Sequence, residues 1–149
     1  MSTQPSDLLH TPLFASHQKL GAKCADFGGW EMPIEYEGAV AEHGAVRSTV
    51  GVFDVSHMGK LRVTGSGAVS ALNSIVASDV AKIGNGQAQY SMLCNESGGV
   101  IDDFIIYRFT EDNIFIIPNA TNATKVFHRL GEALPSEIII ENLHNEYGI

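Results

Sequence analysis

The segment from Tyr90 to Arg108, YSMLCNESGGVIDDFIIYR, constrains the fold of this chain more than any other part. Two adjacent carboxylates, Asp102 and Asp103, interrupt a run with apolar residues at both odd and even positions: Val100, Ile101, Phe104, Ile105, Ile106 and Tyr107. A strand of this kind is usually covered on both faces, and a buried carboxylate is costly unless it is hydrogen-bonded or paired. The pattern therefore indicates that one of the aspartates takes part in chemistry or in ligand binding.

A β-hairpin is predicted here, because Glu96-Ser97-Gly98-Gly99 is a turn signal whose glycines can adopt positive φ. Residues 90–95 and 100–108 then form its two strands. Symmetric closure of the hairpin places Asn95 opposite Val100, Met92 opposite Asp103 and Tyr90 opposite Ile105.

The two aspartates are expected to point in opposite directions, because side chains alternate between the faces of a strand. They therefore cannot act as an acid–base couple on one substrate. Asp103 shares its face with Tyr90, whose aromatic ring can bridge a diagonal separation of about 7–8 Å, so Asp103 is the better candidate. In the alternative, both aspartates lie near the solvent end of the strand and one pairs with Arg108. The hairpin alone does not decide between the two, because a slip of one residue exchanges the faces.

Composition excludes several classes of function. A chain of 149 residues with 44% hydrophobic content can form one domain with a substantial core. Its net charge of −8 and the absence of a basic patch argue against nucleic acid as a partner. The two cysteines and six histidines lack metal-ligand spacing, which predicts no metal site and a reduced intracellular protein. No apolar run reaches membrane-spanning length and no targeting segment is recognised, so no membrane association and a cytoplasmic location are expected.

The order of elements predicts an α+β fold with an antiparallel sheet and helices packed on one side. Thr11-Pro12 is expected to open a short helix that ends at Gly21, and residues 26–38 are expected to form an ordered loop. Further along we expect a helix over 39–50, a strand over 52–64, a helix from 68 to about 76, a second hairpin closed at 110–113, a helix capped by Thr121 that ends near Pro135, and a strand over 137–142.

Several blocks of the sequence resemble one family when they are taken together. They are GAKCADFGGWEMPIEY, EHGAVR, GVFDVSHMGKLRVTG, the Tyr90–Arg108 segment and PNATN, in this order. The chain resembles the N-terminal part of the aminomethyltransferases, the T-proteins of the glycine cleavage system. The likeness covers nearly the whole chain, whereas members of the family are much longer. Residues 1–149 are therefore expected to be the N-terminal part of a truncated folate-binding catalytic domain, ending inside a strand.

The resemblance also implies an activity and a set of site residues. The family transfers the one-carbon unit of an aminomethyl group, carried on the lipoyl arm of H-protein, to tetrahydrofolate, and it releases ammonia. Its catalytic aspartate matches Asp103, which would hydrogen-bond a folate ring nitrogen. Within this chain, Tyr90, Met58, Asn119 and Asn122 also match tetrahydrofolate-binding positions of the family.

Three other functions are weighed against this one. Related folate-binding proteins act in iron–sulfur cluster assembly, and a related tetrahydrofolate domain is fused to flavin-dependent dimethylglycine and sarcosine oxidoreductases. A non-catalytic interaction module would leave Asp103 without a role. The intact DFGGWEMPIEY and DVSHMGK blocks favour the aminomethyltransferase. The 149-residue chain alone is expected to be inactive, and its truncated sheet is expected to promote self-association.

Overall fold

The computed structural model describes residues 8–149, which form two compact units. Unit 1 contains the described residues up to His57 together with Gly148 and Ile149, and unit 2 runs from Met58 to Tyr147. Among the described residues, no helix has the length and apolar character needed to cross a membrane.

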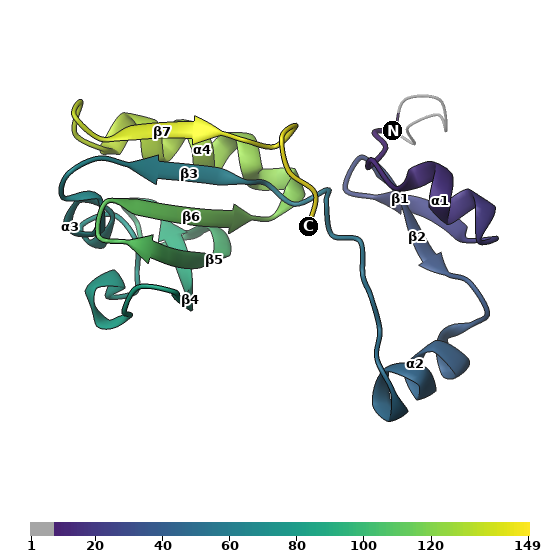
Figure 1. The fold of residues 1–149 in the computed structure, drawn as a ribbon. Helices are drawn as coiled ribbons and strands as arrows, with labels where there is room; N and C mark the ends of the chain where they lie inside the picture. The colour runs from purple at the N-terminus through teal and green to yellow at the C-terminus, as the bar shows by residue number, and fades with distance from the viewer. Residues whose placement is uncertain (1–7) are drawn as a thin grey trace. The chain divides into compact units, whose positions relative to one another are not determined.

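Unit 2 is built on a five-stranded sheet in which all neighbouring strands are antiparallel (Figure 1). The strand order is β4-β5-β6-β3-β7, so β4 and β7 are the edge strands. The bounds of the strands are β3 Leu61–Thr64, β4 Gln87–Cys94, β5 Val100–Thr110, β6 Asn113–Pro118 and β7 Ile139–Asn142.

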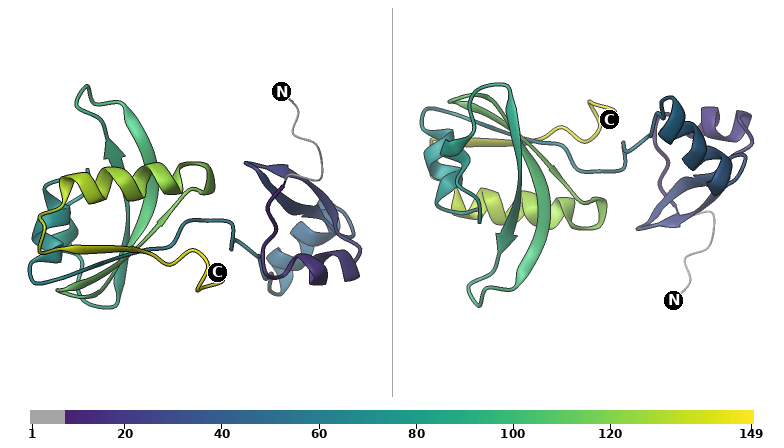
Figure 2. Two further views of the ribbon diagram at one scale, coloured as in Figure 1. Left: turned by 90° about the horizontal axis from the view of Figure 1, so that it is seen from above. Right: turned by 90° about the horizontal axis from the view of Figure 1, so that it is seen from below.

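The core of unit 2 lies on the sheet face that is covered by α3 (Ala68–Asn73) and α4 (Ala123–Ala133), as Figures 1 and 2 show. Val126 and Leu130 of α4 are buried against strand residues such as Leu61 and Ile116. Two short 3₁₀ helices complete the unit, Val80–Lys82 and Ala120–Asn122. The predicted α+β class, with helices on one side of an antiparallel sheet, is confirmed.

The β4–β5 hairpin confirms most of the predicted register. Met92 pairs with Asp103 and Tyr90 pairs with Ile105. The predicted pairing of Asn95 with Val100 is wrong, because an irregularity beside Leu93 makes Cys94 the partner of Val100. The turn is held by the Asn95 side chain, whose Oδ1 accepts from the backbone N–H of Ser97 at 3.1 Å and of Gly99 at 2.8 Å.

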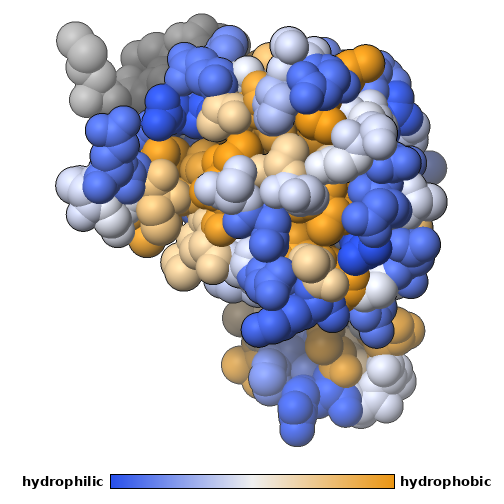
Figure 3. Space-filling model, turned by 90° about the vertical axis from the view of Figure 1, so that its left-hand side faces the viewer, coloured by the Kyte–Doolittle hydropathy of each residue, from blue (hydrophilic) through white to orange (hydrophobic). Residues whose placement is uncertain are grey.

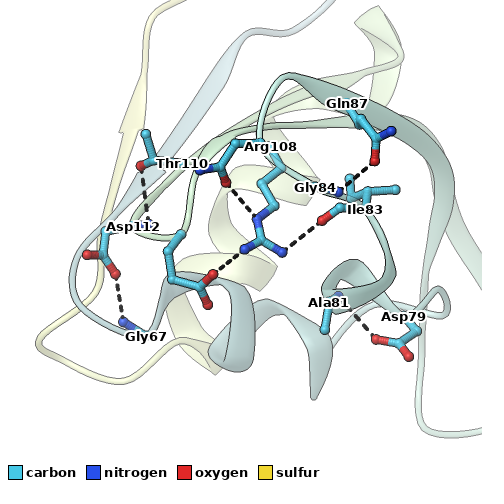
Figure 4. A network of polar contacts seen from close by, with 11 residues as sticks. Gly67, Asp79, Ala81, Ile83, Gly84, Gln87, Arg108, Thr110 and Asp112 are labelled. Carbon is cyan, nitrogen blue, oxygen red and sulfur yellow. Dashed lines mark hydrogen bonds and ion pairs between the residues drawn. The ribbon is translucent and has the colours of Figure 1, made fainter.

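Arg108 lies at the other end of β5, and its partners exclude the alternative in which it neutralises an aspartate of the pair. Its Nη1 donates to the Ile83 carbonyl at 2.8 Å, its Nε donates to Asn85 Oδ1 at 3.2 Å, and its Nη2 pairs with Glu111 (Figure 4). The guanidinium thereby ties the segment before β4 to the end of β5.

Unit 1 contains a hairpin where the sequence predicted a loop. Strand β1 (Lys23–Phe27) pairs antiparallel with β2 (Trp30–Glu35), between helices α1 (Phe14–Lys19) and α2 (Ala39–Ser48). The two-residue turn is Gly28-Gly29, with φ of 64° and 87°. Two successive positive φ values are the requirement of the hairpin turn that Gly-Gly favours, so the loop prediction for residues 26–38 was wrong.

A buried carboxylate, Asp54, holds the segments of unit 1 together. Its Oδ2 accepts from Thr11 Oγ1 at 2.6 Å and from His17 Nε2 at 2.8 Å, and its Oδ1 accepts from Ser56 N–H at 2.9 Å. Tyr36 completes the cluster through a hydrogen bond between its hydroxyl and His17 Nδ1, 2.8 Å apart. The predicted helix cap at Thr11 is therefore wrong: the helix begins at Phe14, and the Thr11 hydroxyl binds Asp54 instead.

The strand predicted over residues 52–64 is confined to Leu61–Thr64. Val52 is 95% exposed and Phe53 is 68% exposed, so these two apolar side chains do not pack into the core of the sheet. Strand β7 also ends there, since Leu61 pairs with its last residue, Asn142, whereas β6 continues past Ile116, the partner of Leu61, to Pro118.

Candidate active site

The sheet register brings one asparagine next to both aspartates of β5. Strand β6 ends at Pro118, which pairs with Phe104, so the next residue, Asn119, lies alongside Asp103. The chain then turns through the short helix Ala120–Asn122 into α4. Asn119 and Asn122 thereby reach the aspartates from an adjacent element, and four of the predicted site residues (Tyr90, Asp103, Asn119 and Asn122) meet in one hydrogen-bonded cluster around Asp102 and Asp103.

Asp103 is half-buried and faces away from the core of the sheet, as predicted. Its carboxylate accepts the hydroxyl of Tyr90 and the side-chain amide of Asn119, whose Nδ2 lies 3.2 Å from Asp103 Oδ1. The surrounding face is open, since Tyr90 is 62% exposed, Met92 37% and Ile105 39%. Asp103 is therefore a carboxylate on an accessible, largely apolar surface.

The hydrogen bond to Asp103 also determines the state of Tyr90. Donation of the Tyr90 hydroxyl to this carboxylate raises the pKa of Tyr90 above its ordinary value, and partial desolvation and the two aspartate charges add to the effect. The phenol therefore stays protonated at neutral pH and acts as a donor toward Asp103.

Asp102 lies on the core side of the same strand and is only 4% exposed. Its Oδ2 accepts the backbone N–H of Asn119 at 2.9 Å, and its Oδ1 accepts Asn119 Nδ2 at 3.1 Å and Asn122 Nδ2 at 2.8 Å. No Lys, Arg or His among residues 8–149 forms an ion pair with it. Three neutral donors therefore compensate for the burial of this charge.

Sequence reasoning placed the two aspartates on opposite faces, which is confirmed, but it missed that Asn119 joins them. The Asn119 amide contacts Asp102 Oδ1, Asp103 Oδ1 and the Asp103 carbonyl, the last at 2.9 Å. The second hairpin indicates that the residues after β6 lie near Asp103, but it does not identify Asn119 as the neighbour. Counting from the predicted turn at 110–113 gives a partner one residue too late, because the strands are irregular between Arg108 and Thr110.

Met58 lies next to this cluster by its position in the chain. The following residue, Gly59, donates its N–H to the carbonyl of Pro118 at 2.9 Å, directly before Asn119. A side chain on Gly59 would come within 2.6 Å of Pro118 Cγ and 2.7 Å of Ala123 Cβ. The glycine therefore permits the close approach that brings Met58 toward the site.

The geometry defines what the cluster can do chemically. It offers a carboxylate at Asp103, an aromatic hydroxyl at Tyr90 and two asparagine amides beside an apolar surface. Such a set can orient a flat ligand that carries N–H donors and can accept a proton from it. Within residues 8–149, no three His, Cys, Asp or Glu side chains are close enough together to hold a metal ion.

Apolar residues also remain on the surface elsewhere. On the side of unit 2 where α3 lies, they gather in the middle of the visible face and are surrounded by hydrophilic residues (Figure 3). Hydrophobic patches that persist on a folded surface often bind something in the functional state.

Comparison with known proteins assigns the family. Residues 13–149 match the model of the GCVT N-terminal domain. The aminomethyltransferase of Mycobacterium avium (strain 104) is 51% identical over 144 residues, which are 97% of this chain and 39% of that protein. The aminomethyltransferase of Mycobacterium tuberculosis (strain CDC 1551 / Oshkosh) is 50% identical over all 149 residues, 40% of its length.

A solved structure leads to the same family. The crystal structure of glycine cleavage system aminomethyltransferase T from Bartonella henselae superposes with a TM-score of 0.87 at 38% sequence identity, over 92% of this chain and 38% of the other. The chain spans about 40% of the length of the curated relatives that it matches. From the family model, the sequence identities and the shared fold together, we conclude that this chain belongs to the aminomethyltransferase family and corresponds to its N-terminal part.

Proposed function

We propose that this chain supplies the tetrahydrofolate-binding and catalytic aspartate of a glycine cleavage system aminomethyltransferase. The complete enzyme would transfer the one-carbon unit from aminomethyl-lipoyl H-protein to tetrahydrofolate and release ammonia. The observation that carries the proposal is the half-buried Asp103 carboxylate on an open apolar face, hydrogen-bonded to Tyr90 and Asn119.

The residues fit tetrahydrofolate in their chemistry. A reduced pterin is a flat ring system with several N–H donors, and the site offers a carboxylate and amide groups next to exposed aromatic and apolar side chains. Tyr90, Met58, Asn119 and Asn122 would hold the pterin, while Asp103 would hydrogen-bond one of its ring nitrogens. Tetrahydrofolate, when bound, supplies the nitrogen atoms that accept the one-carbon unit.

Asp103 would have two tasks in this reaction. Its carboxylate would orient the folate ring nitrogen and would take up the proton that this nitrogen loses. Tyr90, held in its protonated form, would keep the Asp103 carboxylate in position by donating to it. The sheet framework fixes these groups relative to one another, because β4 and β5 are paired directly at Met92 and Asp103.

We also propose that residues 1–149 are an incomplete folate-binding catalytic domain. The partner of the complete enzyme would be lipoylated H-protein, and the enzyme would act in the cytoplasm. The names of the relatives favour an aminomethyltransferase over the iron–sulfur assembly and oxidoreductase alternatives.

The test uses the complete enzyme, defined here as this sequence joined to the C-terminal remainder of a curated relative. Ammonia release and methylenetetrahydrofolate formation are measured with aminomethylated H-protein, with and without tetrahydrofolate. We expect tetrahydrofolate to accelerate ammonia release and one folate product to form per ammonia. Tight tetrahydrofolate binding by calorimetry without any turnover would point to a folate-binding protein with another role, and no binding at all would refute the proposal.

A further inference from the structure

We propose that Asp102 is a positioning residue, which turns the side-chain amides of Asn119 and Asn122 so that their oxygens, and not their NH₂ groups, are offered to the ligand. This inference deepens the proposed function and rests on it. It gives a role to Asp102, which lies on the core side of β5, opposite to the face of Asp103.

Asp102 determines which way the amides of Asn119 and Asn122 are turned. A carboxylate accepts hydrogen bonds and donates none. Because Asp102 Oδ1 lies 3.1 Å from Asn119 Nδ2 and 2.8 Å from Asn122 Nδ2, both amides direct their NH₂ groups toward it. A flip of either amide would bring its oxygen against the buried carboxylate, which is unfavourable at a site that is 4% exposed.

The amide oxygens of Asn119 and Asn122 are the groups that remain for a ligand. The NH₂ group of Asn119 is further engaged by the carbonyl and the carboxylate of Asp103, at 2.9 Å and 3.2 Å. Among residues 8–149, neither Asn119 Oδ1 nor Asn122 Oδ1 has a hydrogen-bond partner. The donors of both amides are thus turned to Asp102, and their oxygens are left as acceptors.

This orientation of the amides makes the site rich in hydrogen-bond acceptors. With Asp103 as a carboxylate and two amide oxygens fixed as acceptors, the polar part of the site presents acceptors to a ligand. A reduced pterin, with its ring N–H and amino groups, is complementary to such a surface. Asp102 thereby favours a donor-rich ring without touching it.

The contacts of the Asn119 and Asn122 amides with the Asp102 carboxylate are called the clamp below. The clamp is tested first in the 149-residue chain, without ligand. NMR spectra of isotope-labelled protein should show hydrogen-bond couplings from the Asn119 and Asn122 Nδ2 atoms to the Asp102 carboxyl carbon, and slowed exchange of both NH₂ groups. In Asp102→Asn these features should disappear, whereas Asp112→Asn, a matched change at an exposed aspartate in the β5–β6 turn, should preserve them. Freely exchanging amides in the wild-type chain would overturn the clamp.

The consequence for the ligand is tested by a double-mutant cycle on the tetrahydrofolate affinity of the complete enzyme. We expect Asp102→Asn to weaken binding about tenfold to a hundredfold, since two acceptors lose their orientation together. In a background that carries Asn119→Ala and Asn122→Ala, the same change should weaken binding less than about threefold. Circular dichroism of each variant verifies folding, and the wild-type NMR measurement decides the clamp even where a variant does not fold.

The outcomes separate this inference from the proposed function. Equal losses from Asp102→Asn in both backgrounds would show that the residue does not act through the asparagines, and would overturn its positioning role. A complete wild-type enzyme that binds no tetrahydrofolate would refute the ligand assignment of the proposed function and the positioning role toward that ligand, while the NMR couplings would still decide whether the clamp exists.

Discussion

Replacing Asp54 by alanine should destabilise unit 1 strongly, although the residue lies outside the candidate active site. The Asp54 side chain is 1% exposed, and it accepts from Thr11, His17 and Ser56 at 2.6, 2.8 and 2.9 Å. Each donor left without a partner costs about 1–3 kcal/mol. Some recovery is expected, because the Thr11 hydroxyl can rotate toward other acceptors. We therefore expect the free energy of unfolding to fall by about 3–5 kcal/mol, a large share of the stability of a small unit.

Trp30 provides an assay that reports on this unit alone. It is the only tryptophan of the chain and lies in β2, so its fluorescence in a urea titration follows unit 1, while circular dichroism follows both units. The control is Glu35→Ala, which removes an exposed ion pair with Lys23 in the same unit and should cost less than about 1 kcal/mol. A loss in Asp54→Ala as small as that of the control would refute the reasoning.

The same carboxylate predicts how the stability of unit 1 depends on pH. Burial alone would raise the pKa of Asp54, but the hydrogen bonds from Thr11, Ser56 and His17 outweigh it and hold the pKa well below its usual range. Its contribution to stability is therefore complete above the unfolded pKa of about 3.9 and is lost progressively as the pH falls below that value. The Trp30 transition of the wild type should shift to lower urea across this acid range, and Asp54→Ala should flatten the shift.

Three further predictions concern unit 2 and the whole chain. Gly59→Ala should lower the melting temperature of unit 2 and broaden the Asn119 resonances, because the added methyl group would meet Pro118 and Ala123 at 2.6 and 2.7 Å; an unchanged melting curve would contradict the close packing. The chain should self-associate at micromolar concentrations through the edge strand β7 and its exposed apolar side chains, and sedimentation velocity showing only monomer would count against this. With H-protein and tetrahydrofolate, the 149-residue chain alone should release no ammonia above background, and measurable turnover would disprove this expectation.

The hairpin around Asp103 could be predicted from the sequence because its signals are local. The turn Glu96–Gly99 and the apolar runs on either side determine the pairing of Met92 with Asp103 without help from the rest of the chain. The signal for the Gly28-Gly29 hairpin is also local, since the turn consists of two glycines. The acidic and aromatic residues around it do not alternate regularly between polar and apolar, so the sequence predicted a loop there.

Interactions between distant segments could not be predicted in the same way. Thr11 has the pattern of a helix cap, but its hydroxyl binds Asp54, 43 residues away. The sequence indicates that a carboxylate buried in this strand is costly, but it does not show which groups would stabilise Asp102. Its donors come from beyond the next strand and depend on a register irregularity that no local signal reveals. Residue propensity and hydrophobic periodicity predict which face of a helix or strand is buried. The hydrogen-bond partners of its polar side chains come from distant segments, and the local sequence does not specify them.

The kinetic constants of the Asp103→Asn variant in the complete enzyme test the central claim most directly, with Asp102→Asn and Asp112→Asn measured alongside. Asp103→Asn should lower kcat by about 10²–10⁴-fold, because the proton acceptor is removed while the shape of the side chain is kept. Asp102→Asn should lower kcat much less and should act mainly on KM for tetrahydrofolate, and Asp112→Asn should change neither. A kcat for Asp103→Asn close to that of Asp112→Asn, with all three variants folded, would contradict the assignment of Asp103 as the catalytic residue.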